Sequence, residues 1–248
     1  MSIIRANGLF TLGVPPEQYH LPHPCLGLPV VLLVRRVLIH AFDLLRERDF
    51  PFATALEDEI TAALKSIIEN DLRKSGKIAG FSKRTYDPVI RQGQVTNYNQ
   101  TKLTKTPDLC FKLRNDEEDR PILSEHDALF VECKPVDGTH SVGGKYCDDG
   151  LCRFVDGDYA WAMEEGMMLA YARKRTIAKH LIPAMQDSKR NIQLKVVDLP
   201  MAIASLNAAA QKTCETLHVS RHRRGFPWVA NKGAATDILI YHSWHCCE

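Results

Sequence analysis

The sequence lacks the short motifs that most directly assign an enzyme class. The stretch "SVGGKY" has neither the spacing nor the Ser or Thr of a glycine-rich nucleotide-binding loop. No Gly-x-Ser-x-Gly elbow and no catalytic-cysteine context occurs. Neither sign of charge dominates, because the 248 residues carry a formal net charge of only +2. That balance excludes a uniformly basic nucleic-acid coat, although a local basic groove is compatible with it.

The sequence also gives no sign of a signal peptide or of a transmembrane segment. The opening "MSIIRANGLFTLGVPPEQYH" has no basic segment leading into an apolar one, so we do not expect a signal peptide. The most apolar run, "LGLPVVLLVRRVLIHAF", is too short to span a bilayer and is interrupted by Arg35 and Arg36. The eight cysteines are irregularly spaced, which favours reduced thiols. We therefore expect a cytoplasmic protein that does not associate with membranes.

Helical periodicity dominates the first third of the chain. The run "VVLLVRRVLIHAFDLLRERD" predicts a helix or another buried element over residues 30–49. A second helix is predicted over residues 53–76, where apolar residues recur from Leu56 to Ile67 at helical spacing. Thr54 is its expected N-cap, with Glu57 completing a capping box, and Gly76 is expected to end it.

Short apolar runs predict strands in the remainder. Residues 108–113 and 128–135 form the clearest pair, joined by the polar stretch 114–126, which is expected to be an exposed connection. The run "GMMLAYA" is interpreted as a buried strand, with a continuing helix as the alternative. The other expected elements are helices over residues 145–163 and 173–188 and strands over residues 216–222 and 237–244.

Charged residues stand inside the clearest pair of strands. Side chains alternate along a strand, so Glu132 and Lys134 project from one face of "LFVECKP". A neighbouring antiparallel strand would bring Asp108 alongside them. Carboxylates grouped in this way suit Mg²⁺ or Mn²⁺, which prefer oxygen ligands, and the lysine could orient or deprotonate an attacking water. The alternative is an exposed edge strand whose charges prevent aggregation.

These residues resemble the motif of a known group. Pro107–Asp108, followed on the next strand by Glu132, Cys133 and Lys134, is similar to the PD-(D/E)xK nuclease superfamily. The resemblance implies an α/β fold with a restriction-endonuclease-like αβββαβ core, in which helices flank a mixed central sheet. It divides the chain into an N-terminal arm and helical extension, 1–52, and a nuclease-like domain with C-terminal additions, 53–248.

The resemblance also implies roles for single residues. Asp108 and Glu132 would bind the divalent metal, and Lys134 would act on the nucleophilic water. An acid on the preceding helix often joins them, and Glu57 is preferred to Glu59 because it lies at the edge of the helix's apolar stripe. With no metal bound, clustered acids repel one another, so at least one should have a raised pKa, partly offset by Lys134.

Basic and aromatic residues suggest how a nucleic acid would be bound. The stretch "YCDDGLCRFVDGDYA" resembles the second core helix of uncharacterised nucleases in phage-defence neighbourhoods, which implies that Tyr146 and Arg153 face a substrate phosphate. A core aromatic and a surface arginine are the alternatives. In "VSRHRRG", Arg221 and Arg223 are candidates for phosphate contact, with a solvated turn as the alternative. Arg224 in the same stretch is a further candidate, and the loop "YNQTKLTKTPD" supplies Lys102 and Lys105 just before Asp108, where they could lie along a nucleic-acid backbone.

The function expected from these observations is a divalent-metal-dependent endonuclease, a hydrolase of DNA in preference to RNA, acting as the effector of a bacterial anti-phage defence system. A helicase or ATPase partner, or a second copy of the chain, would supply control. The alternative is a non-catalytic nucleic-acid-binding or assembly module on the same fold. A zinc site has weak support, because the cysteines and histidines lack paired spacing. Its candidate ligands are His140, Cys147, Cys152, His242, His245, Cys246 and Cys247.

Overall fold

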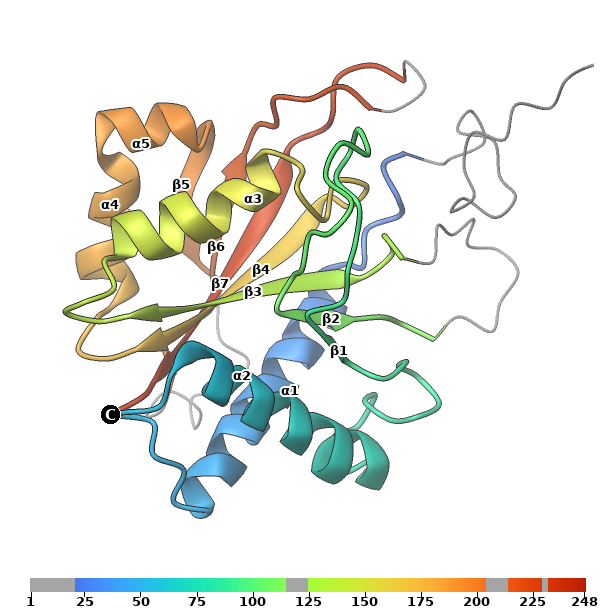
Figure 1. The fold of residues 1–248 in the computed structure, drawn as a ribbon, viewed down its shortest axis with the longest axis vertical. Coiled ribbons are helices and arrows are strands. Elements are labelled where there is room, and N and C mark those ends of the chain that lie inside the picture. Colours follow the sequence, from blue (N-terminus) through green and yellow to red (C-terminus); the bar gives the residue numbers. More distant parts are fainter. Residues whose placement is uncertain (1–20, 115–124, 204–213, 229–231) are drawn as a thin grey trace, which may run out of the picture.

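A seven-stranded mixed sheet runs through the middle of the molecule, with helices on both of its faces (Figure 1). The computed structural model describes residues 21–114, 125–203, 214–228 and 232–248. The strand order across the sheet is β1-β2-β3-β4-β7-β6-β5. The bounds of the strands are β1 Ile90–Arg91, β2 Leu109–Phe111, β3 Leu129–Val136, β4 Glu165–Ala172, β5 Val196–Ala202, β6 His218–His222 and β7 Ile238–Cys246.

The helical elements include both α-helices and π-helical segments, which are labelled η. Their bounds are α1 Leu28–Glu47, α2 Glu57–Ile67, η2 Ile68–Arg73, η3 Val142–Leu151, α3 Cys152–Val155, η4 Ile177–Leu181, α4 Ile182–Gln186 and α5 Ser188–Gln193. The predicted α/β class, a mixed sheet flanked by helices, is confirmed. No helix in the described part of the chain has the length and apolar character needed to cross a membrane.

The centre of the sheet is parallel and its two sides are antiparallel. Strands β3, β4 and β7 run parallel to one another, while β1, β2 and β3 alternate in direction, as do β7, β6 and β5. Every residue of β3 and β4 is buried. Central parallel strands are covered on both faces and therefore read as continuous apolar runs, which confirms the strand interpretation of "GMMLAYA".

Alternating side chains on β7 show which helices cover which face. His242 points to one face, where the hydroxyl of Tyr146 on η3 lies 2.9 Å from its Nδ1. Three positions on, His245 points to the other face, where the ring of Phe42 on α1 stacks on it at 4.2 Å. Because alternate residues of a strand face opposite ways, η3 and α3 cover one face and α1 and α2 cover the other.

Helix α1 is an integral part of the hydrophobic core. Its buried residues recur every three or four positions, and they pack in the same core as those of α2 and the central strands. The strongly apolar run over residues 30–49 is thus a core helix, as its length indicated. The predicted domain boundary between residues 52 and 53 stays a prediction.

Two predictions about helix ends were wrong. Helix α2 begins at Glu57 rather than after Thr54, because Thr54 lies in a turn with its N–H bonded to Pro51 O. The carboxylate of Glu59, not Glu57, accepts the hydrogen bond from Leu56 N at 2.8 Å. The helix expected over residues 145–163 ends at Val155, and a loop follows from Gly157, whose φ of +71° suits glycine.

Strand β5 and helix α5 were missed. β5 contains Pro200, and a proline within a run argues against a central strand. It is tolerated here because β5 is the edge strand of the sheet, where a missing N–H can face outward. The other predicted strands and helices are present, and Gly76 follows the last helical residue of the second helix with φ of +64°. The predicted connection over residues 114–126 lies largely outside the described residues.

A chain of buried hydrogen bonds joins strands β6 and β7 to helix η3, on the face of the sheet that η3 covers. His222 Nδ1 faces the carbonyl of Leu194 at 2.8 Å, so it carries the ring proton, and Nε2 accepts from Ser220 Oγ at 2.7 Å. The Ser220 oxygen in turn accepts from His242 Nε2 at 2.8 Å, and His242 Nδ1 accepts from Tyr146. Burial lowers the pKa of His222 to about 4 and that of His242 well below its usual range. Both rings are therefore neutral at pH 7.

Replacing Ser220 by Ala is expected to lower the free energy of unfolding by about 2–6 kcal/mol. The variant leaves two buried ring nitrogens without a partner, and each unsatisfied group costs roughly 1–3 kcal/mol. Ser243→Ala is the matched control, because the hydroxyl of Ser243 contacts one histidine nitrogen, His245 Nε2 at 3.0 Å. Urea denaturation measures both variants. Equal losses of stability would contradict the assignment of this network.

Candidate active site

Strand register brings two carboxylates to one place. Leu109 on β2 pairs with Val131 on β3 in an antiparallel ladder, so Asp108, one residue earlier, comes opposite Glu132. The position of Asp108 is held by its Oδ2, which accepts a hydrogen bond from Cys133 N at 2.7 Å. The structure therefore brings together Asp108 and Glu132, as alternation along the strand predicted.

The ammonium of Lys134 lies at the centre of the acidic group. Its Nζ is 2.8 Å from Glu132 Oε1 and 2.9 Å from Glu57 Oε1. The third carboxylate, Asp108 Oδ2, is 3.7 Å away. Glu132 and Lys134 are both buried, so these strands do not expose them as an edge would. The edge-strand alternative is thereby excluded for this pair.

Close packing of a helix fixes the stem of Lys134. A Cβ added at Gly150 on η3 would lie 3.3 Å from Lys134 Cγ and 2.7 Å from Met168 Cε. Glycine at this position lets the helix approach β3 and β4 closely enough to cover the lysine stem. Its ammonium is consequently directed toward the carboxylates.

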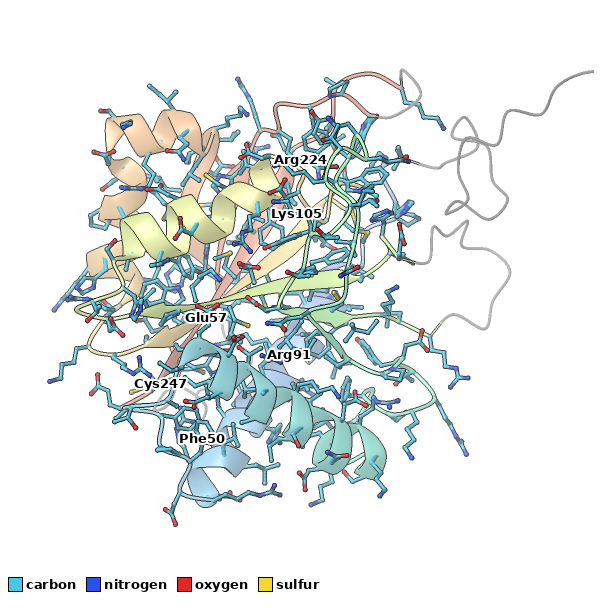
Figure 2. All side chains as sticks on the ribbon, viewed as in Figure 1. Phe50, Glu57, Arg91, Lys105, Arg224 and Cys247 are labelled. Carbon is cyan, nitrogen blue, oxygen red and sulfur yellow. The ribbon has the colours of Figure 1, made fainter. Side chains whose placement is uncertain are left out.

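Glu57 reaches the site because it is the first residue of α2 (Figure 2). The loop before it is held by Arg173, whose guanidinium donates to Phe52 O and to Ala55 O at 2.7 and 2.8 Å. Glu59 points back to the start of the helix, where it caps Leu56 N. The structure thus brings Glu57, and not Glu59, to the other acids, as the position at the edge of the apolar stripe indicated.

Two further side chains bind the Glu132 carboxylate. Arg153 NH1 donates to Oε1 at 2.9 Å, and the hydroxyl of Tyr159 donates to Oε2. Arg153 was a predicted site residue, whereas Tyr159 was missed because the sequence pattern extended the helix past it. The signal that could have found it is Gly157, since glycine commonly ends a helix and would release the residues after it.

Burial and charge act against each other in this group. The pKa of Glu132 is raised to about 7, because burial and the nearby Asp108 raise it by more than Lys134 and Arg153 lower it. The pKa of Glu57 is also raised, chiefly by burial. The prediction of at least one raised acid, partly offset by Lys134, is confirmed. For Lys134, burial alone would lower the pKa, but the three carboxylates outweigh it and raise the pKa above its usual value.

The donor atoms fit a hard cation, although they are arranged here around an ammonium. Carboxylate oxygens of Glu57, Asp108 and Glu132 converge on the positive charge of Lys134. An all-oxygen set of this kind suits Mg²⁺ or Mn²⁺. Among the described residues, no group of three or more His, Cys, Asp or Glu side chains has the geometry of a ready metal site. Metal ligation by these acids stays a prediction.

The zinc alternative gains no support in the described parts of the chain. His242 belongs to the buried network with Ser220, and His245 stacks on Phe42 on the opposite face. His140 lies 3.0 Å from Asp137 Oδ1. Because these rings have separate partners on different faces and loops, they do not form one ligand set.

Predicted phosphate-binding residues are found in several places. Tyr146 is fully buried with its hydroxyl on His242, so it cannot face a phosphate, and the core-aromatic alternative holds. The guanidinium of Arg221 on β6 lies 2.8 Å from Asp198 Oδ2. Strand β6 is the third strand from β3 in the sheet, and neighbouring strands lie about 4.8 Å apart, so Arg221 is distant from the acids. Arg223 is exposed, whereas Arg224 is buried. Arg153 alone among these directly contacts the acidic group.

The lysines before the site contact the loop that carries Tyr159. Lys102 and Lys105 lie 2.8 and 2.5 Å from the carboxylate of Asp158. Arg91 on β1 was not predicted as a site residue. Its guanidinium lies 2.9 Å from the carboxylate of Asp58, the residue after Glu57. Figure 2 labels both Arg91 and Glu57. Arg91 thus lies beside the start of α2, and the segment between β1 and β2 supplies the two lysines that bind the loop after α3.

Comparison of the chain with family models, with curated proteins and with solved structures gave no match. The assignment of a function therefore rests on the residues and their geometry.

Proposed function

We propose that this protein is a divalent-metal-dependent nuclease that hydrolyses phosphodiester bonds, of DNA in preference to RNA. The observation that carries the proposal is the convergence of Glu57, Asp108 and Glu132 on the ammonium of Lys134. Three acids, one at the start of α2, one directly before β2 and one on β3, meet at one buried lysine. A burial of this kind is costly unless the charges are paired or bind an ion, and it is a common feature of catalytic sites.

The residues have distinct roles in this proposal. Glu57, Asp108 and Glu132 would hold Mg²⁺ or Mn²⁺, which when bound acidifies a water and neutralises phosphate charge. Lys134 has a raised pKa and is protonated at neutral pH, so it donates hydrogen bonds rather than accepting a proton. It would orient the water and stabilise the negative charge that develops on the phosphate. Arg153, partly exposed beside Glu132, would contact the phosphate.

The order of elements supports the resemblance to PD-(D/E)xK nucleases. Helix α2 is followed by β1, β2 and β3, then by the η3 and α3 helix and by β4, which is the αβββαβ order. The three acids and the lysine lie at the elements where the resemblance predicts them. Within this proposal the protein is the effector of an anti-phage defence system, with a helicase or ATPase partner or a second copy of the chain supplying control.

A cleavage assay tests the proposal directly. Purified protein is incubated with plasmid DNA, single-stranded DNA and RNA, with Mn²⁺ and with EDTA, and calorimetry measures Mn²⁺ binding in parallel. Metal-dependent cleavage of DNA is the expected result. Nucleic-acid binding without cleavage or Mn²⁺ binding would instead favour a non-catalytic binding module, the second class that this fold could serve.

Arg153→Ala is expected to weaken nucleic-acid binding and to make its salt dependence shallower by about one unit of slope, because one phosphate contact is lost. Arg221→Ala should have a smaller effect, since its guanidinium already pairs with Asp198 away from the acids. Fluorescence anisotropy in Ca²⁺ at several salt concentrations compares the two. A larger effect of Arg221→Ala would place the bound strand across β6 instead.

A further inference from the structure

Tyr159 occupies a position that neither the motif nor the proposed chemistry explains. Its side chain is fully buried, and its hydroxyl donates to Oε2 of Glu132. The other oxygen, Oε1, is the one that faces Lys134 at 2.8 Å. We propose that Tyr159 is a positioning residue that fixes the rotation of the Glu132 carboxylate, so that Oε1 is presented to the divalent metal ion. This inference rests on the proposed function, because it assigns Glu132 a metal-binding role.

The ring of Tyr159 is itself held on two sides. Phe154 on α3 contacts it edge to face, with ring centroids 5.0 Å apart and an interplanar angle of 88°. Phe130 on β3 lies on another side at 6.3 Å. A ring packed in this way leaves the hydroxyl few alternative positions. The hydrogen bond to Glu132 is therefore set by the core and not by a mobile surface group.

The backbone on both sides of Tyr159 is fastened by two other loops. Arg224 NH1 donates to the carbonyls of Ala160 and Trp161 at 3.1 and 3.0 Å. On the preceding side, Asp158 pairs with Lys102 and Lys105. Figure 2 labels Lys105 and Arg224 in the same region, beyond the end of α3. Two loops distant in sequence thus hold the segment that carries the hydroxyl.

These contacts hold the residue after Tyr159 in a strained backbone conformation. Ala160 has a φ of +53°, in the left-handed region that residues with a Cβ seldom adopt. Such a conformation persists only where the surroundings enforce it, and it is concentrated at functional sites. The strain, the buried ring and the directed hydroxyl together indicate that the loop is built to place Tyr159 against Glu132.

The test removes the hydroxyl and keeps the ring. Tyr159→Phe is expected to weaken Mn²⁺ binding, measured by calorimetry, by about 10- to 100-fold, as is typical when a group that orients a ligating carboxylate is lost. Tyr146→Phe is the matched control, because it also removes a buried hydroxyl, bonded to His242 away from the acids. Thermal unfolding verifies that both variants are folded. The control should bind Mn²⁺ as the wild type does.

A second measurement needs no destabilising change. 3-Fluorotyrosine incorporated at position 159 alone retains the hydroxyl, and its ¹⁹F resonance should shift saturably as Mg²⁺ is added. The same probe at position 146 should not shift. A silent probe at 159 beside calorimetric Mg²⁺ binding, or Mn²⁺ binding by Tyr159→Phe equal to that of the wild type, would overturn this inference alone. A wild type that neither binds Mn²⁺ nor cleaves nucleic acid would overturn the proposed function and this inference with it.

Discussion

Glu132→Gln is expected to lower the rate of nucleic-acid cleavage by about 100- to 1,000-fold, because it removes one negative ligand while keeping the shape. A bound metal supplies several kcal/mol of transition-state stabilisation, and each 1.4 kcal/mol or so is a factor of ten in rate. Glu59→Gln is the matched control. Glu59 lies on the same helix as Glu57, but its side chain caps Leu56 N, and an amide oxygen still accepts that bond.

The metal-free stability of the same variant gives an independent check. The pKa of Glu132 is about 7 in the folded protein and near 4.5 when unfolded, so the folded state binds the proton more tightly. Its contribution to stability is complete below pH 4.5 and is lost as the pH rises through 7. The Glu132→Gln side chain does not titrate. Relative to the wild type, the free energy of unfolding of this variant should therefore rise by up to about 3 kcal/mol over this pH range, at about 1.4 kcal/mol per pH unit. Urea denaturation in EDTA measures the difference, and a constant difference would contradict the burial of a charged carboxylate.

The strands of the site were predictable because the side-chain alternation that places their residues depends only on the sequence of each strand. Alternation along "LFVECKP" is enough to place Glu132 and Lys134 on one face, and an antiparallel neighbour is enough to place Asp108 opposite. The choice of Glu57 over Glu59 depended on helical phase, which was correct although the predicted cap was not. Each of these inferences needs only the period of one element and the direction of its neighbour.

The residues that were missed depend on contacts between distant segments. Tyr159 contacts Glu132 because the helix ends at Val155, just before Gly157, and Arg224 holds the loop that follows, and neither event has a periodic signal. Tyr146 lies on η3, which is π-helical, so its turns are wider than those of an α-helix and the side chains sharing a face differ. Its phase could not be taken from an α-helical pattern. Strand β5 was missed because it contains a proline, which an edge strand tolerates and a central strand does not. Its place at the edge depends on the order of the strands in the sheet, which the sequence pattern does not give.

Lys134→Met is expected to have the second large effect, a loss of about 100- to 1,000-fold in cleavage rate, typical of removing a donor that acts on developing charge. The thioether side chain retains the apolar stem that packs beside Gly150, so the variant should fold. Lys145→Met is the control, because Lys145 pairs with Asp149 on an exposed helix surface. Activity of Lys134→Met equal to that of the wild type under metal-saturated conditions would exclude a catalytic lysine.

Metal binding should respond to this variant in the opposite direction to cleavage. In the metal-free protein the ammonium of Lys134 neutralises Glu57, Asp108 and Glu132 from within. Without it, three like charges repel one another at short range, and a divalent cation relieves that repulsion when it binds. Mn²⁺ should therefore raise the melting temperature of Lys134→Met more than that of the wild type, because a ligand that binds only the folded state stabilises it more when its affinity is higher. A smaller rise would mean that the carboxylates need the lysine to hold them together, and that the ammonium and the metal do not compete for the same oxygens.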